Sequence, residues 1–215
     1  MIVVTGAGRC GSSLMMQTLH LLGLPMIGDP ENDMGRNTLK DHDESGVLAK
    51  QILDVNPKGY WELPIDVIYD TLDNNFSNHH GKAIKILSGL FTCIDPTVVE
   101  KVILCRRSNT YNQAEKILEL ANLDLEIRDN NTNTSPLIEW YRGKTVMDIV
   151  LVQDLQLQHT RRIINTNNIP SIDILFEDIV TNPKPEIEKV VRFLNLDVDI
   201  SEALNNVDVR NEISV

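Results

Sequence analysis

Hydrophobic and polar positions along the chain form blocks that predict strands alternating with helices. The first five residues, MIVVT, are a short β-branched run that ends at a glycine, which is typical of a buried parallel strand. The following segment, about residues 13–22, has the pattern of a helix that ends at Gly23, and we expect Ser12 or Ser13 to cap it. The chain therefore opens with a strand, a glycine-rich loop and a helix.

The same alternation continues into the C-terminal part of the chain. Apolar runs bounded by charged residues predict further strands, and helical periodicity or a proline in the first turn predicts further helices. The strands are expected at 82–88, 101–107 and 171–178, and the helices at about 64–75, 109–121, 143–167 and from Asn182, with Pro183 just inside.

Two stretches show neither the strand pattern nor the helix pattern of apolar residues. Residues 24–60 are polar and irregular, and residues 123–136 become rich in Asn and Thr, which indicates a mobile loop or lid. No internal repeat or interdomain linker interrupts the chain, so we expect one domain over residues 1–215. Strands alternating with helices predict an α/β fold with a central, mainly parallel sheet flanked by helices. Its ligand should lie at the carboxyl ends of the strands.

The charge balance and the cysteines narrow the range of partners. The chain has 31 acidic and 20 basic residues, a net charge of −11, which disfavours a nucleic-acid or anionic-membrane partner but permits a local basic pocket. No apolar run approaches the roughly 20 residues of a membrane span, and no secretory signal is visible. Cys10, Cys93 and Cys105 match neither a disulfide framework nor a metal-ligand pattern, so we expect reducing, cytoplasmic surroundings and no metal site.

The loop TGAGRCGSS, residues 5–13, carries the clearest chemical signal. Its frame is that of a phosphate-binding loop, Gly-x-x-x-x-Gly followed by two serines, and it leads into a helix whose N-terminal N–H groups attract phosphate. Ser12 replaces the lysine that a triphosphate-binding loop carries, and Arg9 lies inside the loop instead. We find no clear strand ending in the Asp of a Walker B motif. A tight strand–helix turn without a ligand is the alternative interpretation.

Several segments resemble, in order, the sulfotransferases that use 3′-phosphoadenylyl sulfate (PAPS), especially the compact bacterial and viral members with a GLPRSGTS loop and a Met-rich helix. IVVTGAGRCGSSLMMQTLHLLGLP is similar to their opening, and NPKGYWE to their Asn-Pro-x-Gly-aromatic-aromatic-Glu segment. KVILCRR, ILFEDIVTNPKPEIEKVVRFLNL and VDVR resemble their second donor-binding strand, their Tyr-Glu-Asp strand with its helix, and a C-terminal Val-Asp-x-x-Arg element. The resemblance implies a three-layer P-loop-type fold.

It also implies transfer of a sulfuryl group from PAPS to an acceptor hydroxyl or amine, by in-line displacement and without a metal. Arg9 would face the oxygen that bridges phosphate and sulfate, and Lys85 would lie beside the transferring group. Fixed cations there stabilise the charge that grows as the S–O bond breaks. For Arg9, a solvated loop arginine is the alternative. The loop residues that would hold the 5′-phosphosulfate are Gly8, Arg9, Cys10, Gly11, Ser12 and Ser13.

The general base differs from the family pattern. Many members place a histidine two residues after the lysine, but Leu87 stands there and cannot accept a proton. Glu62 is our candidate base, because some carbohydrate sulfotransferases use a glutamate in a comparable place. Tyr60 and Trp61 could raise its pKa by building a partly apolar pocket. A carboxylate at the start of a helix is the equally plain alternative for Glu62.

The resemblance also implies residues for the rest of the donor. Arg106 or Arg107 would hold the 3′-phosphate at the end of a strand, since a bidentate guanidinium suits a phosphate. The family's serine is not at its usual distance, so Ser108 and Asn112 are possible substitutes, and Arg210 could contribute. Phe176 occupies the position of a tyrosine that stacks on adenine, although a core phenylalanine explains it as well.

Two rival functions stay open at the level of sequence. A small nucleotide or nucleoside kinase with an unusual loop would bind ATP with Mg²⁺, and a non-catalytic relative would bind PAPS or its product, adenosine 3′,5′-bisphosphate (PAP), without transfer. We expect the acceptor to be a small molecule or a glycan. No sequence pattern identifies this acceptor further or indicates the oligomeric state.

Overall fold

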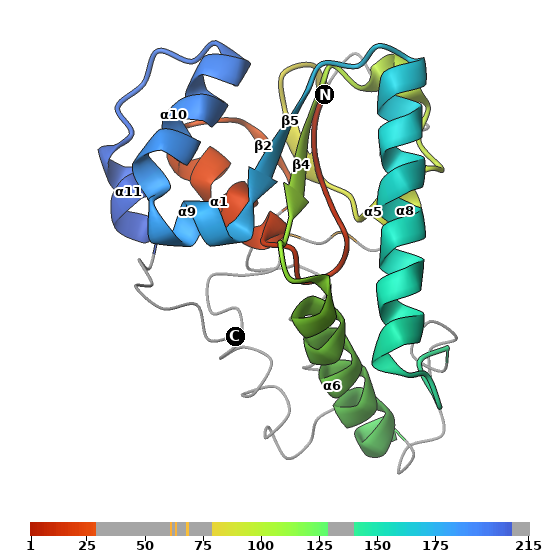
Figure 1. Ribbon diagram of the computed structural model, residues 1–215. Coiled ribbons are helices and arrows are strands. Elements are labelled where there is room, and N and C mark those ends of the chain that lie inside the picture. Colours follow the sequence, from red (N-terminus) through yellow and green to blue (C-terminus); the bar gives the residue numbers. More distant parts are fainter. Residues whose placement is uncertain (29–60, 62, 64–67, 69–78, 129–139, 208–215) are drawn as a thin grey trace.

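The computed structural model describes residues 1–28, 61, 63, 68, 79–128 and 140–207. In that part of the chain, all strands join one parallel sheet in the order β2-β3-β1-β4-β5. The prediction of an α/β fold with a central parallel sheet flanked by helices is confirmed (Figure 1). The strands are β1 Ile2–Thr5, β2 Met26–Ile27, β3 Ala83–Lys85, β4 Lys101–Arg106 and β5 Ser171–Leu175.

Helices cover both faces of this sheet. In Figure 1, α8 stands on one side, α1, α9, α10 and α11 gather on the other, and α6 extends beyond the carboxyl end of β4. Among the described residues, no helix combines the length and the apolar character needed to cross a bilayer. The helices are α1 Ser12–Leu21, α5 Ser88–Phe91, α6 Thr110–Arg128, α8 Val146–Thr166, α9 Phe176–Thr181, α10 Pro183–Leu194 and α11 Ser201–Asn206, with a 3₁₀ turn, η2, at Pro96–Val98.

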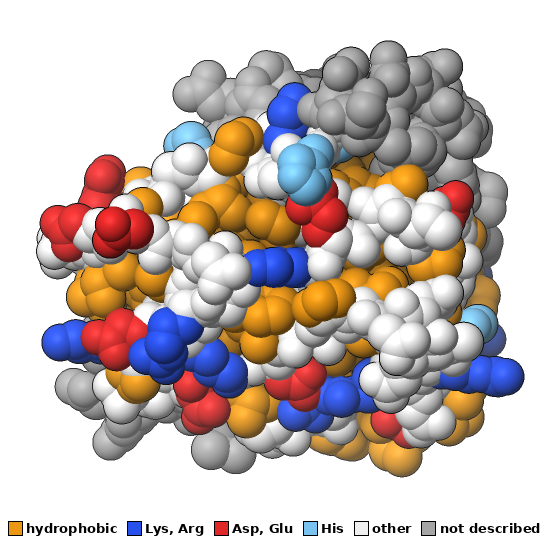
Figure 2. Space-filling view, turned by 90° about the horizontal axis from the view of Figure 1, so that it is seen from above, with side chains coloured by type: hydrophobic (Ala, Val, Ile, Leu, Met, Phe, Trp, Pro, Cys, Tyr) orange, Lys and Arg blue, Asp and Glu red, His pale blue; other side chains and the backbone are white. Residues whose placement is uncertain are grey.

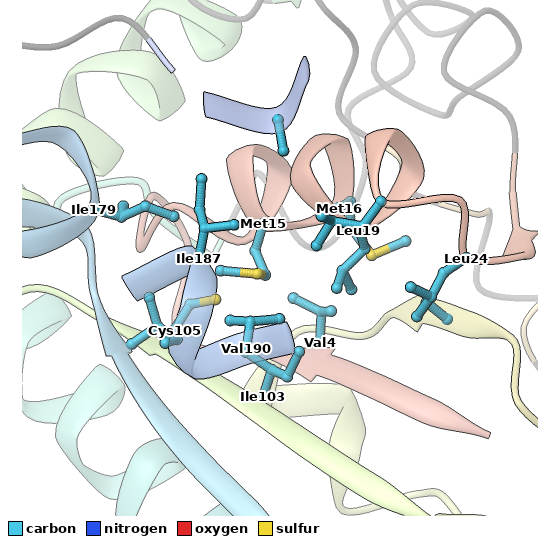
Figure 3. Close-up of a cluster of buried hydrophobic side chains, with 14 of the residues drawn as sticks. Val4, Met15, Met16, Leu19, Leu24, Ile103, Cys105, Ile179, Ile187 and Val190 are labelled. Atoms are coloured by element: carbon cyan, nitrogen blue, oxygen red, sulfur yellow. The ribbon is translucent and has the colours of Figure 1, made fainter. Parts of the chain in front are cut away.

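Among the described residues, two apolar clusters, one on each face of the sheet, form the core. Successive side chains of a strand point to opposite faces. Val4 therefore packs with Met15 and other residues of α1, α9 and α10, as Figure 3 shows, whereas Val3 packs on the other face with a cluster that includes Phe91 of α5 and Ile164 of α8. This alternation explains why MIVVT is apolar at every position from Met1 to Val4, because the strand is buried on both faces.

Local signals fix several of the helix ends. A capping box begins α8: Asp148 N–H donates to Thr145 Oγ1 (3.3 Å), and Thr145 N–H donates to Asp148 Oδ2 (2.8 Å). The start predicted at 143 was therefore slightly early. At α10, Asn182 is the N-cap and Pro183 the first helical residue, as predicted.

Several sequence predictions were wrong in detail. The strand predicted at 82–88 covers only Ala83–Lys85, and Ser88 begins α5. The strand predicted at 171–178 ends at Leu175, and Phe176 begins α9. The predicted lid begins too early, because α6 continues to Arg128 through LELANLDLEIR, whose Leu, Glu, Ala and Arg are strong helix formers. Gly11, and not a serine, is the N-cap of α1. The short strand β2 was missed within the stretch regarded as irregular.

Some predictions fall where the structure gives no description. The helix predicted at 64–75 lies mostly outside the described residues, as do 29–60 and 129–136 of the two irregular stretches. The single domain over residues 1–215 stays a prediction for the same reason.

The amino ends of the strands, opposite the glycine loop, meet around Glu100. Its Oε1 accepts hydrogen bonds from the amine of Met1 (2.6 Å) and from Gly81 N–H (3.1 Å), and lies 2.7 Å from His80 Nδ1. Partial burial works against the charged carboxylate, but these hydrogen bonds lower the pKa of Glu100 below its ordinary value. Figure 2 views the molecule from this side, where acidic and basic side chains are interspersed among apolar ones.

Candidate functional site

The loop between β1 and α1 requires glycine where it touches its neighbours. A Cβ on Gly6 would lie 2.3 Å from the carbonyl oxygen of Cys105 and 2.4 Å from Cys10 Sγ. At Gly11, φ is +91°, and a Cβ would lie 2.6 Å from Cδ2 of Phe176. Both glycines therefore let the loop pack closely against β4 and α9.

The N-terminus of α1 points its first N–H groups at the space above the loop. Its N-cap, Gly11, has no side chain that could accept a hydrogen bond from them, and no acidic residue lies in the first turn. Such a helix end carries a partial positive charge and favours an anion. The backbone of the loop is thus suited to a phosphate group, as its sequence predicts.

Lys85 joins this positive helix end from a neighbouring strand. It is the last residue of β3, which lies beside β1, and its Nζ donates a hydrogen bond to Ser13 Oγ at 3.0 Å. The residue is only 3% exposed. A buried ammonium next to a helix N-terminus places two positive features together, and both attract an anion.

Arg9 and Gln113 shape the middle of the loop. Arg9 has φ +62°, a left-handed conformation that turns the chain sharply between two of the loop's glycines. Gln113, buried on the first turns of α6, donates its side-chain N–H to the carbonyl oxygen of Gly8. Sequence analysis missed Gln113. The available signal was a polar residue beside Ala114 on the buried face of the predicted helix.

Cys10 faces the core and not the ligand side of the loop. Its thiol is buried and shares a hydrogen bond with the thiol of Cys105 in β4. That hydrogen bond, with help from Ser12 and the charge of Lys85, lowers the pKa of Cys10 to about 7 against the effect of burial. The same hydrogen bond and burial raise the pKa of Cys105 well above its ordinary value. Only the backbone of Cys10 is therefore available to the ligand predicted from the sequence.

The two arginines at the carboxyl end of β4, Arg106 as its last residue and Arg107 after it, have different surroundings. Arg106 Nε lies 2.9 Å from Asp173 Oδ2 in β5, and the same carboxylate accepts a hydrogen bond from Arg161 of α8. Arg107 instead lies over the ring of Phe176, with 4.1 Å between its Cζ and the ring centroid. Because Phe176 contacts Gly11, Arg107 is the arginine on the loop side, whereas Arg106 is held in an ion pair.

Of the remaining residues predicted to bind the donor or the acceptor, the structure describes some and not others. Ser108 N–H donates to Glu177 Oε2 at 3.1 Å, which ties the end of β4 to α9, and Asn112 N–H bonds to Asn109 Oδ1 in the first turn of α6. Glu62 and Arg210 lie outside the described residues. Of NPKGYWE only Trp61 is described; it is buried, and its ring lies 5.3 Å from that of His20 in the last turn of α1.

The described site thus gathers a glycine loop, a helix N-terminus and a buried lysine from β3, with Arg107 and Phe176 at its border. A scan against models of known protein families found no match to the chain, and a search of curated proteins found no relative. What the site binds must therefore be judged from its own geometry.

Proposed function

We propose that this chain is a sulfotransferase that moves a sulfuryl group from PAPS to an acceptor hydroxyl or amine without a metal. The observation that carries the proposal is the buried Lys85 at the N-terminus of α1, beside a loop that lacks a lysine of its own. A triphosphate loop carries its lysine within the loop, on the β/γ-phosphates. Lys85 instead reaches the loop from the adjacent strand, β3. This position suits a ligand in which a single phosphate carries a sulfuryl group.

In this proposal, some residues of the site bind the donor and others stabilise the charge that develops during transfer. The N–H groups of the loop and of α1 hold the 5′-phosphate, and Lys85 fixes the position of Ser13 while its charge faces the transferring group. The donor supplies a sulfuryl group already activated by its link to phosphate. As the acceptor oxygen or nitrogen bonds to sulfur and the S–O bond to the bridging oxygen breaks, the cations of Lys85 and Arg9 stabilise the departing negative charge.

Other roles are assigned by the same proposal. Arg107 is the better candidate for the 3′-phosphate, because it lies over the ring of Phe176 on the side of the loop, whereas Arg106 lies against Asp173 of β5. Ser108, Asn112 and Arg210 stay possible supporting contacts. Glu62 is proposed as the base that takes the acceptor's proton. The acceptor is proposed to be a small molecule or a glycan.

The test of this proposal is the substitution Lys85→Met, which keeps the side-chain volume and removes the charge. Removing one group that stabilises a developing charge typically lowers turnover by about 100- to 1,000-fold. We expect a loss of that size in the release of adenosine 3′,5′-bisphosphate from PAPS, in a variant whose cooperative thermal unfolding shows that it is folded. Lys116→Met, at an exposed position of α6, is the control and should behave as wild type. Turnover by Lys85→Met equal to that of wild type would remove Lys85 from the active site.

One feature favours a second function, binding of PAPS or its product without transfer. Leu87, the N-cap of α5, offers no proton acceptor at the position where many sulfotransferases carry a histidine. The two functions separate in a single assay: a binding protein is stabilised by the bisphosphate but forms no sulfated product with any acceptor, whereas the enzyme does both.

A further inference from the structure

Phe176 emerges next to the glycine loop because of where β5 ends. In the parallel register of β4 and β5, Arg106 lies opposite Leu175, so the residues that follow, Arg107 and Phe176, leave the sheet side by side. Phe176 begins α9, and Gly11 packs against its ring and its Cβ. The ring therefore touches both the loop and the chain that leaves β4.

The guanidinium of Arg107 lies over one face of the Phe176 ring. The separation of 4.1 Å between its Cζ and the ring centroid is well inside the ~6 Å range of cation–π contacts. Arg106 cannot exchange roles with it, since its guanidinium is paired with Asp173, which also binds Arg161. The Ser108–Glu177 hydrogen bond further holds this turn against α9. The guanidinium of Arg107 is thus fixed beside the loop before any ligand binds.

We infer that Phe176 is a positioning residue that holds the Arg107 guanidinium beside the phosphate-binding loop, and is not a stacking platform for the base of the donor. A guanidinium at this distance occupies the ring face that it covers, and a base cannot lie on that face at the same time. An arginine that is already ordered also loses less side-chain entropy when it binds an anion. The inference rests on the proposed function in that Arg107 is taken to bind the 3′-phosphate of the donor.

Two ligands separate positioning from base stacking. Adenosine 3′,5′-bisphosphate carries the 3′-phosphate that the proposed function assigns to Arg107, whereas adenosine 5′-monophosphate keeps the base and the 5′-phosphate but lacks the 3′-phosphate. If Phe176 positions Arg107, Phe176→Leu weakens the bisphosphate about threefold, from the typical strength of a cation–π contact, and leaves the monophosphate unchanged, and Phe176→Tyr restores the bisphosphate. If Phe176 stacks on the base, Phe176→Leu weakens both ligands by the same factor. Isothermal titration at fixed salt measures both affinities.

A double-mutant cycle adds a second, independent readout. Once Arg107→Gln has removed the guanidinium, Phe176→Leu should cause no further loss of bisphosphate affinity, because the two residues act through one group. Independent losses that multiply would overturn the inference. Phe193→Leu is the matched control: this ring of α10 also carries a cation, Lys101 at 5.2 Å, and its loss should leave both affinities unchanged.

Each result of these binding measurements either supports or contradicts the positioning role of Phe176. Phe176→Met replaces Phe176→Leu if that variant fails to fold, which the melting temperature reveals. Equal affinity of the wild type for the bisphosphate and the monophosphate removes Arg107 from the 3′-phosphate and overturns the inference, although the loop can still bind the 5′-phosphate. Binding of neither ligand by the wild type overturns both the proposed function and the inference.

Discussion

At the scale of single residues, the conformation of the loop depends on glycines at positions where a larger side chain would clash with its neighbours. Gly11 has a left-handed backbone and touches the ring of Phe176, and Gly6 is pressed between Cys10 and the backbone of Cys105. The motif alone predicts these glycines, but the neighbours that make them necessary belong to β4 and α9, far away in sequence. Lys85, Arg9 and the loop were recognised as one site from the sequence because they occur within an ordered set of family-like motifs.

Gly11→Ala should be much more damaging than the same change at Gly23. Both positions have positive φ, +91° and +82°, but at Gly23 no atom of the described residues lies within 4 Å of a Cβ. The backbone term costs about 1 kcal/mol at each site, and the overlap with Phe176 adds about 1–3 kcal/mol at Gly11 alone. Urea unfolding of the two variants measures the difference. Equal losses would show that the ring does not restrict the loop.

The two buried cysteines predict a dependence of stability on pH. The pKa of Cys10 falls from 9.0 to about 7 on folding, so between these values the unfolded chain holds a proton that the folded chain has released. Stability should therefore rise from pH 7 to pH 9. Above that range the gain is lost, because folded Cys105, with its raised pKa, keeps a proton that the unfolded chain releases.

Urea unfolding at pH 7, 8 and 9 tests this rise against two variants. Cys10→Ser should lack the rise, and Cys93→Ser, which changes an exposed cysteine, should keep it. A rise of the same size in Cys10→Ser would assign it to other groups.

At the scale of secondary structure, elements with local signals were predictable and elements made by tertiary contacts were not. Pro183 marks the start of α10 within the chain's own sequence, and the β-branched run marks β1. In contrast, β2 has only two residues and exists because it pairs with β3. The strand predicted through Phe176 ends earlier, since the next residues turn into α9 and place the aromatic ring against the loop.

The capping box of α8 should contribute measurable stability. Thr145→Ala removes the hydroxyl that accepts the Asp148 N–H, and loss of such an N-cap costs about 1 kcal/mol. Thr166→Ala, an exposed position at the other end of α8, should change stability by less than about 0.5 kcal/mol. Thermal unfolding compares the two, and an equal effect would mean that the box does not stabilise the helix start.

At the scale of the whole molecule, the parallel sheet assembles the site from distant parts of the sequence. β1 lies between β3 and β4, so Lys85 and the chain leaving β4 reach the loop from its two sides. The sequence predicted that these residues share the carboxyl edge, because that is where parallel strands place their ligand. It could not distinguish Arg106 from Arg107, since the difference depends on Asp173, Arg161 and the register of β4 and β5.

The proposed function depends on the kind of phosphate compound that the carboxyl edge of the sheet binds. The most direct measurement is a side-by-side thermal-shift titration with adenosine 3′,5′-bisphosphate, ATP and ATP with Mg²⁺. A site with a lysine-free loop and a buried Lys85 should be stabilised by the bisphosphate in the absence of metal, with a shift that grows with ligand concentration. Stabilisation by ATP only when Mg²⁺ is present, with no shift from the bisphosphate, would contradict the sulfotransferase proposal and favour a kinase.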